Sequence, residues 1–266
     1  MEADLLMASQ QKNAGESAFW ILCVMGLFAI LSSTMSKSPV LKPFSLSLGT
    51  PTDWTGFVAA ASTVPGILAS LPAASLSDIF GRKKFLLISG FVFASAPFLY
   101  LLITVWWQLI MVRFYHGFAT AIFVPVAEAS IAELFPTGRG ERISLFSSMT
   151  YIGRVIAPTL GGYILFITGN DFHALYLSVA VAGVTALIMA LPFLAGRRQL
   201  TIIQRGSAKG IVGRVFRGWR TVARSRGVLE VSFVQACQYY AYGTVEFYLA
   251  GYLPEVIHFN MFLTGV

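Results

Sequence analysis

The chain has 266 residues, of which 56% are hydrophobic and only 12% are charged. A water-soluble domain of this length cannot bury so much apolar surface, so the composition excludes an ordinary soluble protein and predicts an all-α polytopic membrane protein. The formal net charge of +7 would favour nucleic-acid binding in a soluble chain. Here the cations lie between apolar runs, where membrane topology explains them, and we expect no nucleic-acid partner.

Seven apolar runs along the chain are each long enough to cross a bilayer. We expect membrane helices at about residues 18–40, 54–77, 85–105, 108–135, 143–168, 173–195 and 228–253. A polar and mobile tail (1–17) precedes a six-helix bundle (18–195), a basic linker (196–227) follows it, and residues 228–266 hold helix 7 and the start of an incomplete second half. Prolines at 65 and 72 are expected to break the second helix. Small polar residues and Lys37 in the later half of the first helix suit helix contacts or a cavity wall.

The cations are distributed unevenly between the two sides of this bundle. The three connections expected on one side hold fourteen Lys or Arg residues, whereas those on the other side hold one, Lys42. Because basic loops stay in the cytoplasm, the N-terminus and the linker are predicted to be cytoplasmic, in a plasma membrane. The linker holds nine of these cations and no acid, which favours contact with anionic lipid over nucleic acid.

The turn between the second and third runs carries Asp78, Gly81, Arg82 and Lys83. Glycine permits the positive φ angle of a sharp turn. An aspartate there suits the positive N-terminus of a neighbouring helix, and Arg82 is placed to pair with an acid at another cytoplasmic helix end. The plainer alternative is a positive-inside loop with a turn glycine.

The fourth helix contains Arg113, Gly117, Ala121 and Glu128, which share about one quarter of the helical wheel. A charge within a membrane helix normally faces the bundle interior and is functional. The alternative is that Arg113 snorkels to the outer boundary, which is about two turns away.

The fifth helix carries a stripe of small residues, Gly153, Ala157 and Gly161, with Pro158 and Gly162 beside it. Such a stripe lets two helices approach closely, and the proline can bend its helix. A generic packing surface is the alternative.

Arg154 lies near the middle of the fifth helix, at a depth similar to that of Glu128 on the fourth. A short loop joins these helices, so we expect them to be antiparallel neighbours and the two charges to pair. Glu128 is then the candidate proton carrier and Arg154 its tuning partner, with Arg113 as a second positive group nearer the outside. A fixed structural ion pair is the alternative.

The seventh helix places Gln235, Tyr239, Tyr242 and Glu246 on one face. A polar and aromatic stripe in a membrane helix is typical of a substrate cavity, although hydrogen bonds between helices would also explain it. The histidines are scattered, and no catalytic or nucleotide-binding motif occurs, so we expect no metal, no cofactor and no enzyme activity.

Three of these patterns resemble motifs of the major facilitator superfamily. The turn resembles its helix 2–3 loop, Gly-x-x-x-Asp-(Arg/Lys)-x-Gly-(Arg/Lys)-(Arg/Lys), with Ala74 and Ile79 as departures. The spacing around Arg113 resembles the helix-4 motif. The fifth-helix block resembles the Gly-Pro-x-x-Gly-Gly motif of drug–proton antiporters, with Ala157 for its first glycine and Leu145 for an upstream one. The resemblance implies that the turn latches the two halves of a transporter and that Arg113 is tied to proton coupling.

The resemblance covers the N-terminal half of such a transporter plus helix 7. It implies a secondary active transporter, here truncated, which exports a small organic compound or drug by proton-coupled alternating access. Its partners would be the lipid bilayer, a small-molecule substrate, protons, and the missing C-terminal half or a second copy. A sugar or metabolite symporter or uniporter is the alternative, and a non-transporting seven-helix membrane receptor is an alternative of a different class.

Overall fold

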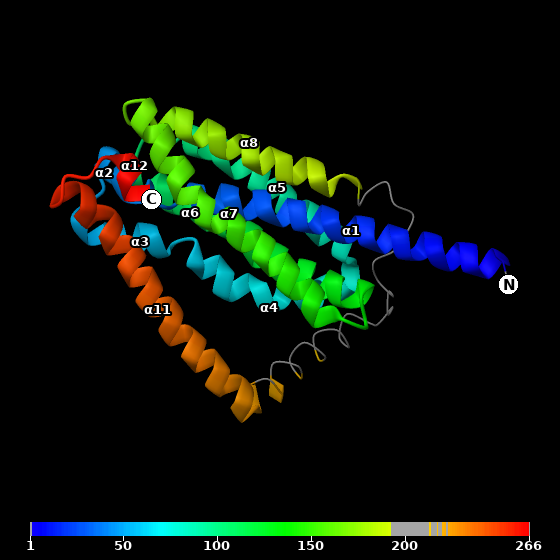
Figure 1. Ribbon diagram of the computed structural model, residues 1–266. Helices are drawn as coiled ribbons and strands as arrows, with labels where there is room; N and C mark the ends of the chain where they lie inside the picture. The colour runs from blue at the N-terminus through cyan, green and yellow to red at the C-terminus, as the bar shows by residue number, and fades with distance from the viewer. Residues whose placement is uncertain (1, 193–212, 214–216, 218–219, 222, 266) are drawn as a thin grey trace.

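The computed structural model describes residues 2–192, 213, 217, 220, 221 and 223–265. Every regular element within these residues is a helix (Figure 1). In chain order they are α1 (Glu2–Met35), α2 (Leu41–Ser47), η1 (Thr52–Trp54), α3 (Thr55–Ala60), α4 (Thr63–Phe80), α5 (Arg82–Leu101), α6 (Trp106–Leu134), α7 (Arg139–Ile167), α8 (Phe172–Ala190), α11 (Arg226–Glu255) and α12 (Met261–Gly265). Most of the predicted basic linker falls outside the described residues.

Five of these helices are long and apolar enough to cross a membrane, or six if the bent segment that contains α3 and α4 counts as one span. The five are Asn13–Met35 of α1 and the whole of α5, α6, α7 and α8. The all-α polytopic fold class is therefore confirmed. Helix α11 forms where the seventh run was expected, but it does not meet the same criterion among the described residues, so a seventh span stays a prediction.

The first helix extends beyond its expected bounds at its N-terminal end and stops short at the other. Residues expected as a mobile tail continue α1, and Glu16 in this part pairs with Arg142 at the start of α7, with oxygen–nitrogen distances of 2.6 and 2.9 Å. The helix ends at Met35 because Pro39 has no N–H to continue the hydrogen-bond ladder.

The second apolar run is broken at two places. The first break, at residues 61–62, lies one turn before the predicted position, because Pro65 lacks the N–H that would bond to the Ala61 carbonyl. The second is a bend of 48° between Thr52–Ser70 and Pro72–Phe80, as predicted. Pro65 itself lies inside α4.

The bundle packs by contacts between helices that are distant in sequence. Helix α1 packs chiefly on α7 and α8, α5 on α6 and α8, and α4 on α6. Aromatic side chains fill the interior, including Phe19, Phe93, Phe123 and Phe146. Figure 1 shows α11 diverging from this bundle, with its later end beside α2. Helix α11 therefore meets the bundle mainly at its later end and does not join its core.

Replacing Gly183 of α8 with alanine is expected to destabilise the bundle by about 1–3 kcal/mol, because overpacking strains a close contact. A Cβ atom at Gly183 would collide with the Phe93 carbonyl oxygen of α5 and lie 2.9 Å from its carbonyl carbon. The measurement is the thermal unfolding midpoint in nanodiscs. Gly140→Ala is the matched control: its Cβ meets open space, so a midpoint equal to or above the parent's is expected. Equal effects of the two variants would contradict the close α5–α8 contact.

Candidate functional site

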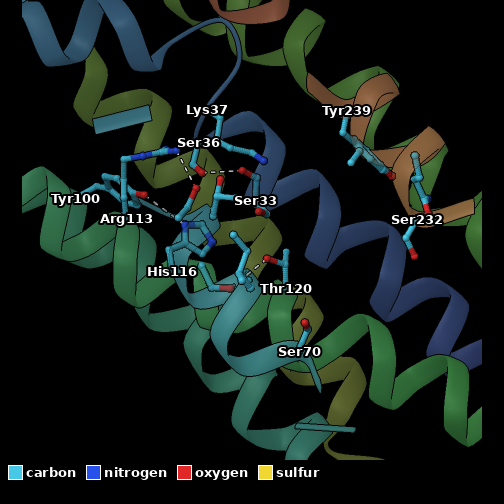
Figure 2. Close-up of a pocket in the computed structure, with 17 residues that line it drawn as sticks. Ser33, Ser36, Lys37, Ser70, Tyr100, Arg113, His116, Thr120, Ser232 and Tyr239 are labelled. Carbon is cyan, nitrogen blue, oxygen red and sulfur yellow. Dashed lines mark hydrogen bonds between the residues drawn. The ribbon is translucent and has the colours of Figure 1, made fainter. Parts of the chain in front are cut away.

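A polar cavity of about 830 Å³ opens between the bundle and α11 (Figure 2). It is lined by residues of α4, α5, α6 and α11 and of the end of α1: Ser33, Ser36, Lys37, Ser62, Thr63, Gly66, Ile67, Ser70, Tyr100, Arg113, His116, Gly117, Thr120, Ser232, Gln235, Ala236 and Tyr239. The polar residues at the end of α1 thus form part of a cavity wall. Its volume lies in the range typical of small-molecule sites.

Arg113 is the most deeply placed cation of this cavity. Its residue is only 2% exposed, and its guanidinium makes three hydrogen bonds. Its Nε donates to the Val58 carbonyl at 2.7 Å, and its Nη2 donates to the Ala59 carbonyl at 3.0 Å and to Ser62 Oγ at 2.9 Å. Arg113 therefore faces the bundle interior and does not snorkel to the outer boundary.

The break in the second apolar run explains these hydrogen bonds. Val58 and Ala59 belong to the last turn of α3, where helical carbonyls have no partner within the helix. Arg113 supplies that partner from α6. Gly117, one turn further along α6, makes room for the contact, because a Cβ there would lie 2.5 Å from Pro65 Cγ and collide with the Ser62 carbonyl oxygen. The arginine and the glycine act together to seat the broken helix on α6.

His116 and Tyr100 lie beside Arg113 and were missed as site residues in the sequence. The Tyr100 hydroxyl lies 3.5 Å from His116 Nδ1. His116 Nε2 is buried and has no hydrogen-bond partner among the described residues. The helical spacing carried a usable signal: His116 and Thr120 follow Arg113 by three and seven residues and so share its face. Tyr100 had no local signal.

A smaller cavity of about 210 Å³ adjoins the first and shares Lys37, Ser62, Thr63 and Arg113 with it. Lys42 also lines it. The cationic side chains of the α1–α2 region and of α6 are thus gathered at the end of the bundle opposite the turn at residues 78–84.

The predicted stripe on α11 is only partly brought to the cavity. Gln235 and Tyr239 line it, and Figure 2 shows Tyr239 and Ser232 across the open space from Lys37 and His116. Tyr242 does not line this cavity and is 57% exposed. Glu246 lies on α11, but its side chain is outside the described part of the structure.

The turn at residues 78–84 forms a compact ionic cluster. Arg82 Nη2 lies 2.8 Å from Asp78 Oδ1, and its Nε lies 2.9 Å from Glu133 Oε2 at the end of α6. The Arg82 side chain is only 9% exposed. Gly81 has φ = 101°, a backbone angle that a sharp turn requires and that glycine adopts freely. The Gly81 N–H donates to the Ser77 carbonyl at the end of α4. Lys83 lies half-buried on α5. Arg82 thus joins the end of α4, the start of α5 and the end of α6.

One face of the small-residue stripe on α7 packs against α1. A Cβ at Gly153 would lie 2.5 Å from the Leu27 carbonyl oxygen, and one at Gly161 would lie 3.3 Å from Met35 Cγ. Ala157 between them is fully buried. These three positions allow the close helix contact that was expected.

The other face of the stripe packs against α12. Thr159 Oγ1 donates to the Gly265 carbonyl at 3.0 Å. A Cβ at Gly265 would collide with the Pro158 carbonyl oxygen and lie 3.4 Å from the Gly162 Cα atom. The motif on α7 thus serves two helix contacts, one within the bundle and one with the segment after α11.

The expected ion pair between Glu128 and Arg154 is not formed. The ion pairs of the described residues do not include it, and the Arg154 guanidinium lies 5.3 Å from the Tyr151 ring centroid instead. Both residues are half-buried. The prediction assumed that helices joined by a short loop are close neighbours, but α7 packs chiefly on α1 and only slightly on α6. Glu128 also lies apart from the cavity lining.

The comparisons with known proteins agree with this architecture. The model of the Major Facilitator Superfamily matches residues 18–266. Multidrug transporter TPO1_2 of Candida glabrata is 38% identical over 92 residues, covering 34% of this chain and 16% of that protein. The uncharacterized MFS-type transporter YqjV of Bacillus subtilis is 27% identical over 184 residues, covering 65% and 42%. The D-xylose transporter of Levilactobacillus brevis is 31% identical over 143 residues, covering 53% and 30%.

Two solved structures share the fold. A bacterial homologue of the human lysosomal transporter Spinster, in an inward-facing and unoccupied conformation, aligns with a TM-score of 0.73 at 15% identity, covering 94% of this chain and 58% of that one. The human organic anion transporter MFSD10 aligns with a TM-score of 0.69 at 14% identity, covering 94% and 70%. The chain spans less than half the length of the curated relatives given above. Because the family match covers nearly the whole sequence, the chain belongs to the major facilitator superfamily and is a multi-pass membrane protein.

Proposed function

We propose that this chain forms the N-terminal part of a secondary active transporter that exports a small organic compound or drug in exchange for protons. The observation that carries the proposal is the polar cavity between the six-helix bundle and α11. In transporters of this architecture the substrate lies between two halves that rock against each other. Two curated relatives are multidrug transporters, which supports an organic compound as the substrate.

The wall opposite the bundle needs more helices than α11 alone. We infer that they come from the remainder of a longer chain or from a second copy. The cytoplasmic N-terminus and the plasma-membrane location belong to the same proposal, and the cation distribution between the loops supports them.

A sugar or metabolite carrier is the second candidate. Serine and threonine hydroxyls from four helices line the cavity, among them Ser33, Ser70, Thr120 and Ser232, and hydroxyl groups suit a sugar. One relative is a D-xylose transporter. The two candidates differ in the substrate and its coupling: an organic compound exchanged for protons in the first, and a sugar or metabolite that moves alone or together with an ion in the second.

The test reconstitutes two proteins separately into liposomes that contain a pH-sensitive dye. One is the 266-residue chain, and the other is the product of the complete reading frame that contains its coding sequence. Three dansyl compounds are added in turn: dansylglycine, its neutral amide, and the amine dansylcadaverine. We expect at least one to move protons at a rate well above that of protein-free liposomes. D-xylose uptake without proton movement would favour the second candidate. Absence of flux of every compound would overturn the proposal, and flux by the 266-residue chain alone would show that a second copy completes the wall.

Glu128→Gln is expected to abolish proton-driven transport while leaving exchange of substrate down its own gradient. Carboxyl groups within membrane helices are the usual proton carriers of transporters, and Glu128 is a half-buried acid within α6. The measurement compares flux with and without an imposed pH gradient. Glu141→Gln, at an exposed position in the first turn of α7, is the matched control and should behave as the parent. A Glu128→Gln variant that still couples to the pH gradient would show that Glu128 is not the carrier.

A further inference from the structure

We propose that the cavity binds an amphipathic organic anion, with its carboxylate or sulfonate between Lys37 and His116 and its apolar body toward α11. This inference rests on the proposed transport function, because it names the substrate class of the same cavity. It goes further in choosing the sign of the substrate's charge.

The charge of the cavity wall is the first support. Lys37 and Arg113 both line the cavity, and none of the described residues that line it is an aspartate or a glutamate. A cationic wall without a carboxylate, in surroundings of low dielectric constant, attracts anions and repels cations. Among the described residues of this lining a cationic drug would find no carboxylate.

The hydrogen bonds of Arg113 preserve this charge. Its three acceptors are two backbone carbonyls and a serine hydroxyl, all of them neutral. These bonds hold the guanidinium in place without cancelling its charge, so Arg113 acts as a positioning residue that also sets the potential of the cavity. A charge within a membrane bundle is costly unless an opposite charge is at hand, and a bound anion would supply it.

His116 provides the second, independent support. It is only 4% exposed, it lines the cavity, and its Nε2 has no hydrogen-bond partner in the described part of the chain. Buried polar atoms nearly always have a partner, so this atom points to a ligand. When the Tyr100 hydroxyl donates to Nδ1, the ring proton lies on Nε2, which then donates to an anionic oxygen. Figure 2 shows the His116 ring on the same wall as Lys37 and Arg113.

The remaining wall suits an apolar body. Ser36 Oγ donates to the Ser33 carbonyl and Thr120 Oγ1 donates to the Gly117 carbonyl, so these two hydroxyl protons are already engaged. On the other side Ala236 and Tyr239 line the cavity from α11, beside the polar Ser232 and Gln235. An organic anion with a ring system satisfies both walls, whereas an inorganic anion would leave most of the 830 Å³ unfilled.

The experiment measures equilibrium binding of the three dansyl probes to the chain in nanodiscs of zwitterionic lipid, so that no anionic lipid competes. The probes share one ring system and differ in charge. We expect dansylglycine to bind at least tenfold more tightly than its neutral amide and dansylcadaverine to bind most weakly. Lys37→Gln and His116→Phe should each weaken dansylglycine by about tenfold and leave the amide within about twofold.

Lys84→Gln is the matched control, because it removes the same charge at an exposed position in the turn at residues 78–84; all three affinities should stay at parental values. Lys37→Arg keeps the cation and should keep the preference for dansylglycine, and near-parental binding of the amide by Lys37→Gln excludes misfolding as the cause of its loss. Equal binding of the three probes, tighter binding of the amine, or an equal loss for dansylglycine and its amide in Lys37→Gln would overturn the inference. Proton flux driven by the amide or the amine would then still support transport, whereas absence of flux for every probe would reject the transport proposal itself.

Discussion

The free energy of unfolding of an Arg113→Leu variant is expected to fall by about 3 kcal/mol, and the variant is expected to lose all transport. The guanidinium donates to two carbonyls at the end of α3 and to Ser62. A hydrogen bond to a charged group contributes about 1.5–3 kcal/mol. Part of this loss is offset because the variant no longer has to desolvate a buried charge. Leucine would leave the last turn of α3 without these partners, so the broken helix should detach from α6.

The measurement for Arg113 is the thermal unfolding midpoint in nanodiscs, paired with hydrogen exchange of residues 55–62. Arg139→Leu removes the same group from an exposed position at the start of α7 and serves as the control. Arg113→Lys keeps the charge without the guanidinium fork, so an intermediate loss is expected. A parental midpoint and unchanged exchange at α3 in Arg113→Leu would show that the three hydrogen bonds contribute little.

An Arg82→Gln variant is expected to transport at least tenfold more slowly, with equilibrium substrate binding within a few-fold of the parent. Arg82 joins Asp78 at the end of α4 to Glu133 at the end of α6, far along the bundle from the cavity. Without the cation the two carboxylates face each other, so the ends of α4 and α6 should separate. If the cluster acts as the proposed latch, a change at this site should alter the balance between conformations and leave the binding residues in place.

The assay for Arg82 compares flux in liposomes with equilibrium binding of the same compound. Lys84 is exposed and lies two residues after Arg82. Lys84→Gln also removes a cation, and this variant should transport normally. Asp78→Asn and Glu133→Gln each leave Arg82 one acidic partner, so a smaller loss is expected for each. Parental flux in Arg82→Gln, or loss of binding with normal conformational cycling, would show that the cluster does not control conformation.

The sequence alone determined the class of fold and the positions of the main helices, because a bilayer demands long apolar runs and leaves charge for the connections. The turn at Gly81 was predictable for a local reason, since only glycine adopts its φ angle freely. Local patterns also indicated that Arg113 and Gly117 share a face and that the stripe through Gly153 and Gly161 serves a helix contact.

One helix end moved for a local reason, whereas the choice of helix partners depended on contacts beyond the local sequence. Proline acts on the turn before it, which moved the first break in the second run from Pro65 to residues 61–62. The pairing of Glu128 with Arg154 was predicted from a short loop, but such a loop does not decide which helices pack most closely, and α7 packs chiefly on α1.

Only the tertiary structure placed Arg113 against carbonyls more than fifty residues away in sequence, because those carbonyls are released by a proline on another helix. It alone also brought His116, Tyr100 and Lys37 from three segments to one wall. Lys37 and His116 each carried a local signal and Tyr100 carried none, but no local pattern indicated that the three residues meet. A cavity is a property of the space between helices, so its lining and its charge follow from their packing and not from any one helix.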